Sequence, residues 1–292
     1  MGKGLFLGLT TIDILYGVGS HPSANEKLKA EWQLTYAGGP AANAAVAFSA
    51  LGHESHLCSG LGNHPAADLA LRDLAEHGVT FHDCAADPDA HPVLSSILVN
   101  SISGDRCVIY SNTDERYLLE EADYNSYLSG CEILLLDGYY LSQAVMLARL
   151  ARQCGVKVVF DGGSWKNGLD NLLPYVDYAI CSENFVPPGC IDPQSVFAYL
   201  SRYEIAGCAV SRGRNSIAAC EGGRVYLTEV AEVNAIDTLG AGDILHGAFC
   251  SSILSRSFKD SLEKAAAIAS ESCRYYGTRQ WIKHHDKERQ RQ

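Results

Sequence analysis

A glycine-rich segment in the last third of the chain carries the residues best suited to chemistry. The segment reads Asp237-Thr238-Leu239-Gly240-Ala241-Gly242-Asp243 and runs into an apolar helical stretch. Its two glycines let backbone N–H groups face a ligand without an intervening Cβ. The start of a helix adds unpaired donors and a partial positive charge. Together these features favour an anion, such as a phosphoryl group in transfer.

The carboxylate of Asp243 stands in the first turn of that expected helix, beside the anion site. A general base in this place takes the proton of an attacking hydroxyl, which is worth about 10²- to 10⁴-fold in rate. The spacing of the segment fits equally well a tight turn followed by a plain helix cap. On this segment alone, both interpretations stay open.

An earlier segment places one polar side chain in an apolar helix. It reads Ala37-Gly38-Gly39-Pro40-Ala41-Ala42-Asn43. Proline suits the first helical position, and a helix that is apolar all round should be buried. A buried Asn43 amide needs partners, which are either substrate hydroxyls or a nearby backbone carbonyl. Asp13, shortly after the first apolar run, either accepts two hydroxyls or is an ordinary strand-end residue.

Composition limits the class of function. The chain has 292 residues and a formal net charge of −11, so we expect no nucleic-acid partner. No apolar run reaches the roughly 20 residues of a membrane helix, and we expect no signal peptide and no membrane partner. The 11 cysteines are scattered singly, which predicts reduced core residues in a cytoplasmic protein.

Short apolar runs alternate with helical stretches, which predicts an α/β fold with a parallel sheet and crossover helices. The expected strands cover 5–9, 56–60, 133–137, 156–161, 178–181 and 208–211, with a late hairpin over 216–230. The expected helices cover 40–51, 65–77, 142–154, 193–203, 241–255 and 259–276. Several strands end in Asp, Gly or Ser, as expected where the carboxyl ends of strands form a ligand crevice.

Two regions break this alternation. Residues 12–37 and 93–111 each read as two strands around a polar connection, and together they predict a small additional sheet. The last ten residues, 283–292, are polar, and we expect them to fray.

Taken together, these segments resemble the PfkB family of carbohydrate kinases, which have the ribokinase-like fold. Gly38-Gly39 with Asn43 is similar to the first family signature, and residues 237–243 are similar to the second, D-T-x-G-A-G-D. The resemblance runs from about Leu5 to about Ile282. It implies one domain over 1–282, an α/β/α sandwich with a small β-sheet lid formed by 12–37 and 93–111.

The resemblance also implies ATP as the phosphoryl donor, Mg²⁺ as a bridging ion and a small sugar as the acceptor. In this assignment Asp243 is the base and the backbone of Gly240, Ala241 and Gly242 is the anion hole. The implied substrate contacts are Asp13, Gly38, Gly39 and Asn43. The implied nucleotide contacts are Ser211, Gly213, Asn184, Lys166 and Thr238. Asp237 belongs to a loop that in relatives often holds a monovalent cation such as K⁺.

The sequence departs from the family in two places. Relatives often carry N-x-x-E after a middle strand, where the acidic residue helps to place Mg²⁺. Here the stretch is Asn184-Phe185-Val186-Pro187, so Glu183 is the candidate replacement for the acidic residue. Relatives also often carry Asp-x-Asn-x-Arg after the strand that ends at Asp161. Here Lys166 either replaces that arginine near the phosphates or is solvated.

The substrate is the least determined feature. Lys27 and Arg106, in the expected lid, either pair with an anionic substituent of the sugar or are ordinary surface charges. A nucleoside kinase is an alternative, because an aromatic residue could stack on a base; the candidates are Trp32, Tyr36, Tyr110, Tyr139 and Tyr140. A catalytically silent sugar or nucleotide sensor is a second alternative, motivated by the altered Asn184–Pro187 stretch. By resemblance, a homodimer through the lid is also expected.

Overall fold

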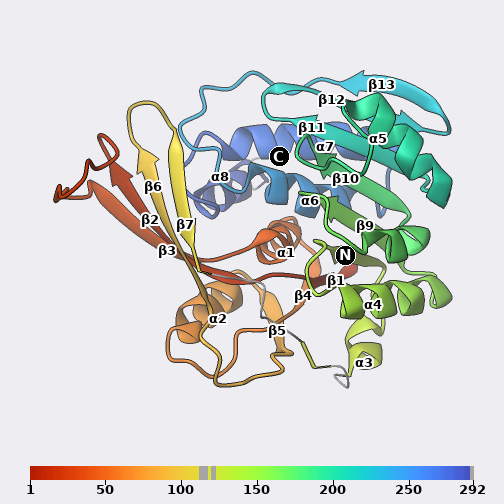
Figure 1. The fold of residues 1–292 in the computed structure, drawn as a ribbon, viewed down its shortest axis with the longest axis horizontal. Helices are drawn as coiled ribbons and strands as arrows, with labels where there is room; N and C mark the ends of the chain where they lie inside the picture. Colours follow the sequence, from red (N-terminus) through yellow and green to blue (C-terminus); the bar gives the residue numbers. More distant parts are fainter. Residues whose placement is uncertain (112–117, 120–122, 290–292) are drawn as a thin grey trace.

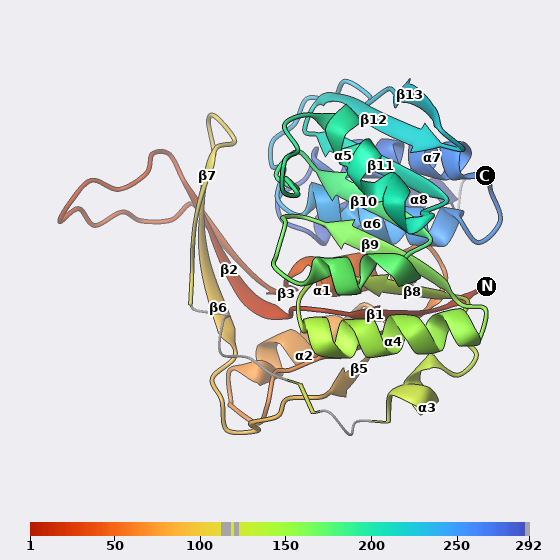
Figure 2. The same ribbon diagram turned by 45° about the vertical axis from the view of Figure 1, so that its right-hand side comes forward.

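The protein consists of two separate β-sheets, one large and one small, with helices packed against the large one (Figure 1). The computed structural model describes residues 1–111, 118–119 and 123–289. Figure 2 shows the small sheet standing beside the body of the molecule, with the β2–β3 connection extending away from it.

The large sheet has nine strands in the order β13-β12-β11-β10-β9-β8-β1-β4-β5. From β11 to β5 neighbouring strands are parallel, while β12 and β13 continue as an antiparallel hairpin. The strands are β1 Lys3–Leu7, β4 Glu54–Ser59, β5 Val79–Asp83, β8 Ile133–Leu136, β9 Lys157–Gly162, β10 Tyr178–Ser182, β11 Gly207–Arg212, β12 Asn215–Glu221 and β13 Arg224–Thr228. All six expected parallel strands and the late hairpin are confirmed. The edge strand β5 was not predicted, because Val-Thr-Phe-His-Asp is short and half polar.

Two layers of helices cover the sheet, as an α/β/α sandwich requires. One apolar cluster joins it to α1 Pro40–Ala50, α2 Ala67–Glu76, α6 Ala241–Ser252, α7 Phe258–Ser272 and Trp281 of α8. The other joins it to α3 Tyr124–Leu128, α4 Leu141–Gln153 and α5 Pro193–Leu200. Phe6 belongs to the first cluster and its neighbours Leu5 and Leu7 to the second, because successive side chains of a strand point to opposite faces. The expected helix over 193–203 ends in a 3₁₀ turn, Ser201–Tyr203.

The small sheet has the order β3-β2-β6-β7, with β2 Thr11–Val18, β3 Trp32–Gly38, β6 Val93–Asn100 and β7 Arg106–Tyr110. These are the four strands expected in 12–37 and 93–111. A third apolar cluster, built on Leu15, Ile97 and Val99, reaches Leu239 in the glycine-rich segment. The small sheet is therefore packed against the chain that leads into α6.

The C-terminal end differs from its prediction. A polar, frayed tail was expected from residue 283, but α8 Gln280–Arg289 continues as a helix through most of it. A ring contact from Tyr275 to His284 and the burial of Trp281 in the first apolar cluster hold the start of this helix against the body. Residues 290–292 lie outside the described residues.

All 11 cysteines are free, and most are buried, so the expected core position holds for most of them. No helix within the described ranges is both long enough and apolar enough to cross a bilayer.

Candidate active site

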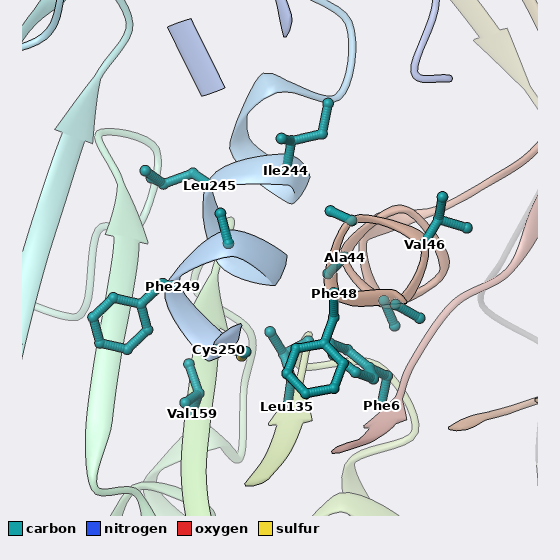
Figure 3. Packing of buried hydrophobic residues seen from close by; sticks show 14 of the residues in the cluster. Phe6, Ala44, Val46, Phe48, Leu135, Val159, Ile244, Leu245, Phe249 and Cys250 are labelled. Carbon is teal, nitrogen blue, oxygen red and sulfur yellow. The ribbon is translucent and has the colours of Figure 1, made fainter. Parts of the chain in front are cut away.

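Helices α1 and α6 lie side by side above the sheet, and their close packing creates the centre of the site. Figure 3 shows both helices above the strands that carry Leu135 and Val159. The contact is so close that a Cβ on Gly247 would lie 2.3 Å from the Ala44 carbonyl oxygen. Small residues on both helices therefore allow the backbones to meet. As a result, the Asn43 side chain, next to Ala44 on α1, contacts the Asp243 side chain, one turn before Gly247 on α6.

Asp243 is partly exposed, and its Oδ2 accepts a 2.8 Å hydrogen bond from Nδ2 of Asn43. Burial raises the pKa of this carboxyl, while the hydrogen bond from Asn43 opposes the rise. The charges of His246, Arg279 and Arg106 also favour the ionised form. A carboxylate with a raised pKa and one free oxygen suits a general base.

The glycine-rich turn before Asp243 has the geometry of an anion site. Gly240 adopts a left-handed conformation, with φ of 69°, and caps the N-terminus of α6. The amide of Ala241 makes a long bond, 3.3 Å, to the Thr238 carbonyl. The amides of Gly242 and Asp243 lie in the first turn, where no earlier helical carbonyl is available to them. Gly242 is exposed and has open space on its Cβ side, so a ligand can approach these N–H groups.

Asp13 and the paired glycines form a second part of the site. Asp13 is 8% exposed on β2, and its Oδ1 accepts a 2.6 Å bond from the Thr11 hydroxyl. A Cβ on Gly38 would lie 2.0 Å from Oδ2 of Asp13, and one on Gly39 would lie 2.2 Å from the Leu9 carbonyl oxygen. Burial raises the pKa of Asp13, and the charge of Asp243 raises it further. The two carboxylates therefore share one site.

Two buried carboxylates lie at the carboxyl ends of β8 and β9, Asp137 directly after β8 and Asp161 as the second-last residue of β9. Asp137 accepts backbone N–H bonds from Leu9, Ala41 and Tyr139, and burial raises its pKa to about 6. Burial raises the pKa of Asp161 to about 7, against the effect of His246. The sequence places acids at several strand ends, but its local patterns assign neither Asp137 nor Asp161 to the site.

Lys166 lies with these two carboxylates. Its Nζ is 3.7 Å from the centroid of the Tyr139 ring. Burial lowers the pKa of Lys166, and the charges of Asp137 and Asp161 oppose that shift. The lysine is thus partly buried at the strand ends rather than fully solvated.

Three of the expected nucleotide contacts, Ser211, Gly213 and Asn184, lie at the ends of β10 and β11, whereas Lys166 lies by Tyr139 and Thr238 lies in the glycine-rich segment. The amide of Glu183 donates a 2.9 Å bond to the Ser211 carbonyl, and Ser182 is paired in register with Ser211. Asn184 is exposed beside Glu183, and Gly213, with φ of 57°, lies in an open turn. Within the described residues, no group of three or more His, Cys, Asp or Glu side chains could enclose a metal ion.

The small sheet reaches the glycine-rich segment through Arg106. Nη1 of Arg106 donates to the Thr238 hydroxyl. The neighbouring Asp237 accepts backbone N–H bonds from Leu239 at 2.9 Å and from Gly277 at 2.8 Å. Lys27 is exposed in the projecting β2–β3 connection, and the structure does not bring it to the other site residues.

Sequence reasoning missed Arg279 and Asp73. Both are buried, and Nη2 of Arg279 lies 2.9 Å from Oδ2 of Asp73. Nη1 of Arg279 donates a 2.8 Å bond to Oδ1 of Asn43. Burial acts to raise the pKa of Asp73, but His77 and Arg279 together hold it below its usual value. Neither residue belongs to a local motif, so only the tertiary structure identifies them.

Comparison with known proteins gives concordant matches. A model of the pfkB family of carbohydrate kinases matches residues 1–284. Fructosamine kinase FrlD of Bacillus subtilis is 29% identical over 251 residues, which cover 83% of this chain and 85% of the relative.

Two solved structures share the fold. A putative ribokinase from Agrobacterium tumefaciens superposes with a TM-score of 0.83 at 22% identity, covering 100% of this chain and 99% of the other. A putative ribokinase II from E. coli, in complex with ATP and Mg²⁺, superposes with a TM-score of 0.79 at 20% identity, covering 100% of both chains. The ribokinase-like fold, with its large sheet and separate small sheet, is therefore shown.

Proposed function

Because the chain belongs to the pfkB family of carbohydrate kinases, we propose that it transfers the γ-phosphoryl group of ATP to a primary hydroxyl of a small sugar. The observation that carries this proposal is the convergence of Asp243 with the first-turn amides of α6. A base for the hydroxyl proton and donors for the phosphoryl oxygens stand at adjacent positions of one helix.

In the proposed reaction, the sugar lies between Asp13, the Gly38–Gly39 backbone and Asp243. Asp243 accepts the proton of the hydroxyl as the hydroxyl oxygen bonds to the γ-phosphorus. The bond from that phosphorus to the bridging oxygen breaks, and ADP leaves with the bonding electrons. The amides of Gly242 and Asp243 face the charge on the transferring group, where each such donor is worth roughly 3–4 kcal/mol.

The nucleotide occupies the carboxyl ends of β10 and β11 in this proposal, near Ser211, Gly213 and Asn184. The E. coli neighbour with ATP and Mg²⁺ bound has the same fold. Mg²⁺ takes few protein oxygens and binds chiefly to phosphates and water, which fits a site without an all-protein cage. Glu183 and Asn184, both exposed, would hold the ion, which neutralises phosphate charge. Both Asp237 oxygens already accept N–H bonds, and no proposed step involves a monovalent cation.

The aromatic residues favour a sugar over a nucleoside. A nucleoside kinase needs an aromatic face to stack on the base. Trp32 packs on Tyr276, with centroids 4.6 Å apart, and the face of Tyr139 is covered by Lys166. Tyr36 lies 5.5 Å from the Arg279 guanidinium. Three of the candidate rings are thus occupied within the protein, while Tyr110 is exposed on β7. The site itself is built on the polar side chains of Asp13 and Asp243.

A substrate screen tests the proposal. ATP consumption would be measured with ribose, deoxyribose, fructose, a fructosamine, phosphorylated sugars and adenosine, using the wild type and Asp243→Asn. We expect turnover with a sugar and a loss of about 10²- to 10⁴-fold in kcat for the variant. An equally active Asp243→Asn would contradict the mechanism. Ligand-induced thermal shifts without turnover on the whole panel would instead support the silent sensor.

We also propose that the chain forms a homodimer through the small sheet. Its edge strand β7 is exposed along its whole length, including Val108, Ile109 and Tyr110. Exposed apolar edge strands tend to pair with another chain. Light scattering should give a dimer mass, and Ile109→Lys should give a monomer. A wild-type monomer at micromolar concentration would rule this out.

A further inference from the structure

Asn43 lies in the middle of a buried hydrogen-bond chain that ends on Asp243. Its Nδ2 donates to Oδ2 of Asp243 at 2.8 Å, and its Oδ1 accepts from Nη1 of Arg279 at 2.8 Å. Asn43 and Arg279 are each 4% exposed, so water does not compete for these bonds. Both ends of the amide are therefore engaged within the protein.

The chain fixes which way the amide points. A guanidinium has only N–H donors and stays charged at all relevant pH values. Arg279 can therefore face only the amide oxygen of Asn43, and the amide nitrogen must face Asp243. The bond holds Oδ2 of Asp243 and leaves Oδ1 of that carboxylate to accept a proton.

Besides Asn43 on α1, the Arg279 guanidinium contacts residues on α2 and β3. Its Nη2 donates to Oδ2 of Asp73 on α2 at 2.9 Å and to the Ala37 carbonyl at 2.6 Å. Oδ2 of Asp73 also accepts from the Ala37 amide at 3.0 Å. The Asp73–Arg279 pair thus binds both backbone polar groups of Ala37, next to Gly38 at the end of β3. The same pair therefore anchors the small sheet and, through Asn43, Asp243.

We propose that Arg279 is a positioning residue that acts through Asn43. It fixes the orientation of the Asp243 carboxylate and the position of that carboxylate relative to strand β3. This inference rests on the proposed function, in which Asp243 is the base. A rotated carboxylate loses its alignment with the substrate hydroxyl, and small misplacements of this kind reduce rates on the order of 10- to 100-fold.

A double-mutant cycle tests the link. Arg279→Lys keeps the charge opposite Asp73 but loses the guanidinium fork, and Asn43→Ala removes the intermediary. We expect Arg279→Lys to lower kcat on the order of 10- to 100-fold with an unchanged KM for ATP. In the Asn43→Ala background the same change should have an effect of about twofold or less, because its route to Asp243 is gone. If the two substitutions act independently, so that their fold losses in kcat multiply in the double variant, the proposal is overturned.

A second measurement needs no turnover. The ¹³C resonance of the Asp243 carboxyl would be followed by NMR against pH in the full chain. Since a donor to the carboxylate favours its ionised form, both Asn43→Ala and Arg279→Lys should move the titration to higher pH. A titration of Arg279→Lys that coincides with the wild type overturns the proposal. Because no substrate enters, this result is distinct from a failure to find an acceptor sugar.

Two further variants separate positioning from folding. Trp281→Phe removes the 3.1 Å bond from Trp281 Nε1 to the Thr278 carbonyl in the same buried segment. It should lower Tm yet leave the Asp243 titration and kcat unchanged. A titration shift as large as that of Arg279→Lys would contradict a specific route from Arg279 through Asn43 to Asp243.

If Arg279→Lys does not fold, the double variant Asp73→Asn/Arg279→Gln removes both charges together. It should show the same titration shift, and the absence of a shift counts against the proposal.

Discussion

Nδ1 of His246 lies 3.4 Å from Oδ2 of Asp161, and both side chains are buried. The ring nitrogens of His246 also lie 2.7 Å from the Gly242 carbonyl oxygen and 2.9 Å from the Ile180 carbonyl oxygen. The imidazole therefore ties β10 to the first turn of α6, the turn that carries Asp243. His246 also offsets part of the negative charge of the buried Asp161 carboxyl.

The two buried strand-end carboxyls give a pH dependence of stability. Their pKa values rise from 3.8 to about 6 for Asp137 and to about 7 for Asp161 when the chain folds. The folded state therefore binds more protons than the unfolded state between about pH 4 and 7. The stabilisation from these groups is complete below their unfolded pKa values. It is lost as pH rises through the folded values.

We therefore expect the free energy of unfolding to decrease from pH 5 to pH 8. One pKa unit corresponds to about 1.4 kcal/mol, so the decrease should be on the order of 1 kcal/mol or more. Urea unfolding at several pH values measures it. Asp161→Asn should flatten the dependence, whereas Glu232→Gln, at an exposed position, should not. A wild-type stability that increases over this range would contradict the assignment.

The two glycines of the glycine-rich turn should respond differently to alanine. Gly242 has open space on its Cβ side, so Gly242→Ala should fold normally and gain up to about 1 kcal/mol from helix propensity. Its methyl group would stand at the mouth of the anion site and displace the phosphoryl oxygens from the amides. We expect kcat/KM to fall about 10²- to 10³-fold with Tm unchanged or raised.

Gly240→Ala is the matched comparison. Its φ of 69° costs an alanine about 1–2 kcal/mol, and the new Cβ would lie 2.5 Å from Cγ2 of Thr278. This variant should lose both stability and activity. Thermal unfolding measures Tm and an ATP-coupled assay measures kcat/KM for both Gly240→Ala and Gly242→Ala. Full activity in Gly242→Ala would show that the phosphoryl group binds elsewhere.

Local sequence patterns predicted the parts of the site that are encoded locally. The glycine spacing before Asp243 and the Gly38–Gly39 pair follow from turn chemistry, and both segments lie where a strand or loop enters a helix. The alternating apolar runs predicted the main strands because parallel strands are buried on both faces. The small sheet followed from two hairpin-like regions that broke this alternation.

Tertiary contacts explain what the patterns could not predict. Asn43 and Asp243 are 200 residues apart and meet because Gly247 lets α1 and α6 approach closely. Arg279 has no motif around it, and its burial depends on Asp73, 206 positions earlier. The helix over 280–289 is polar in sequence, and the ring contact of Tyr275 with His284 and the burial of Trp281 support it.

The buried ion pair of Asp73 and Arg279 should matter far more to stability than a surface pair. Asp73→Ala leaves the Arg279 charge unpaired in the interior, which typically costs about 3–5 kcal/mol. Glu263→Ala breaks the exposed pair with Lys259, 3.8 Å long and one helical turn away, and should cost about 0.3–0.5 kcal/mol. Urea unfolding of both variants at pH 7 gives the comparison. Equal losses would mean that Arg279 is solvated in the folded chain.

Arg106 should control substrate retention rather than folding. It is exposed on β7 and donates to the Thr238 hydroxyl, and so connects the small sheet to the segment that leads into α6. Its charge also favours the ionised form of Asp243. Arg106→Gln removes the charged hydrogen bond that joins the small sheet to Thr238. Because one such bond is lost, we expect KM for the sugar to rise about tenfold. Tm should stay unchanged because the side chain is exposed.

Arg224→Gln is the matched control for Arg106→Gln, because Arg224 is also exposed and lies on β13, an edge strand of the large sheet. The two variants lose the same charge from the same kind of surface position. If a general loss of positive charge raised KM by weakening attraction for ATP, both would show it. A rise confined to Arg106→Gln therefore assigns the effect to the contact with Thr238, and equal values of KM in the two variants would refute that assignment.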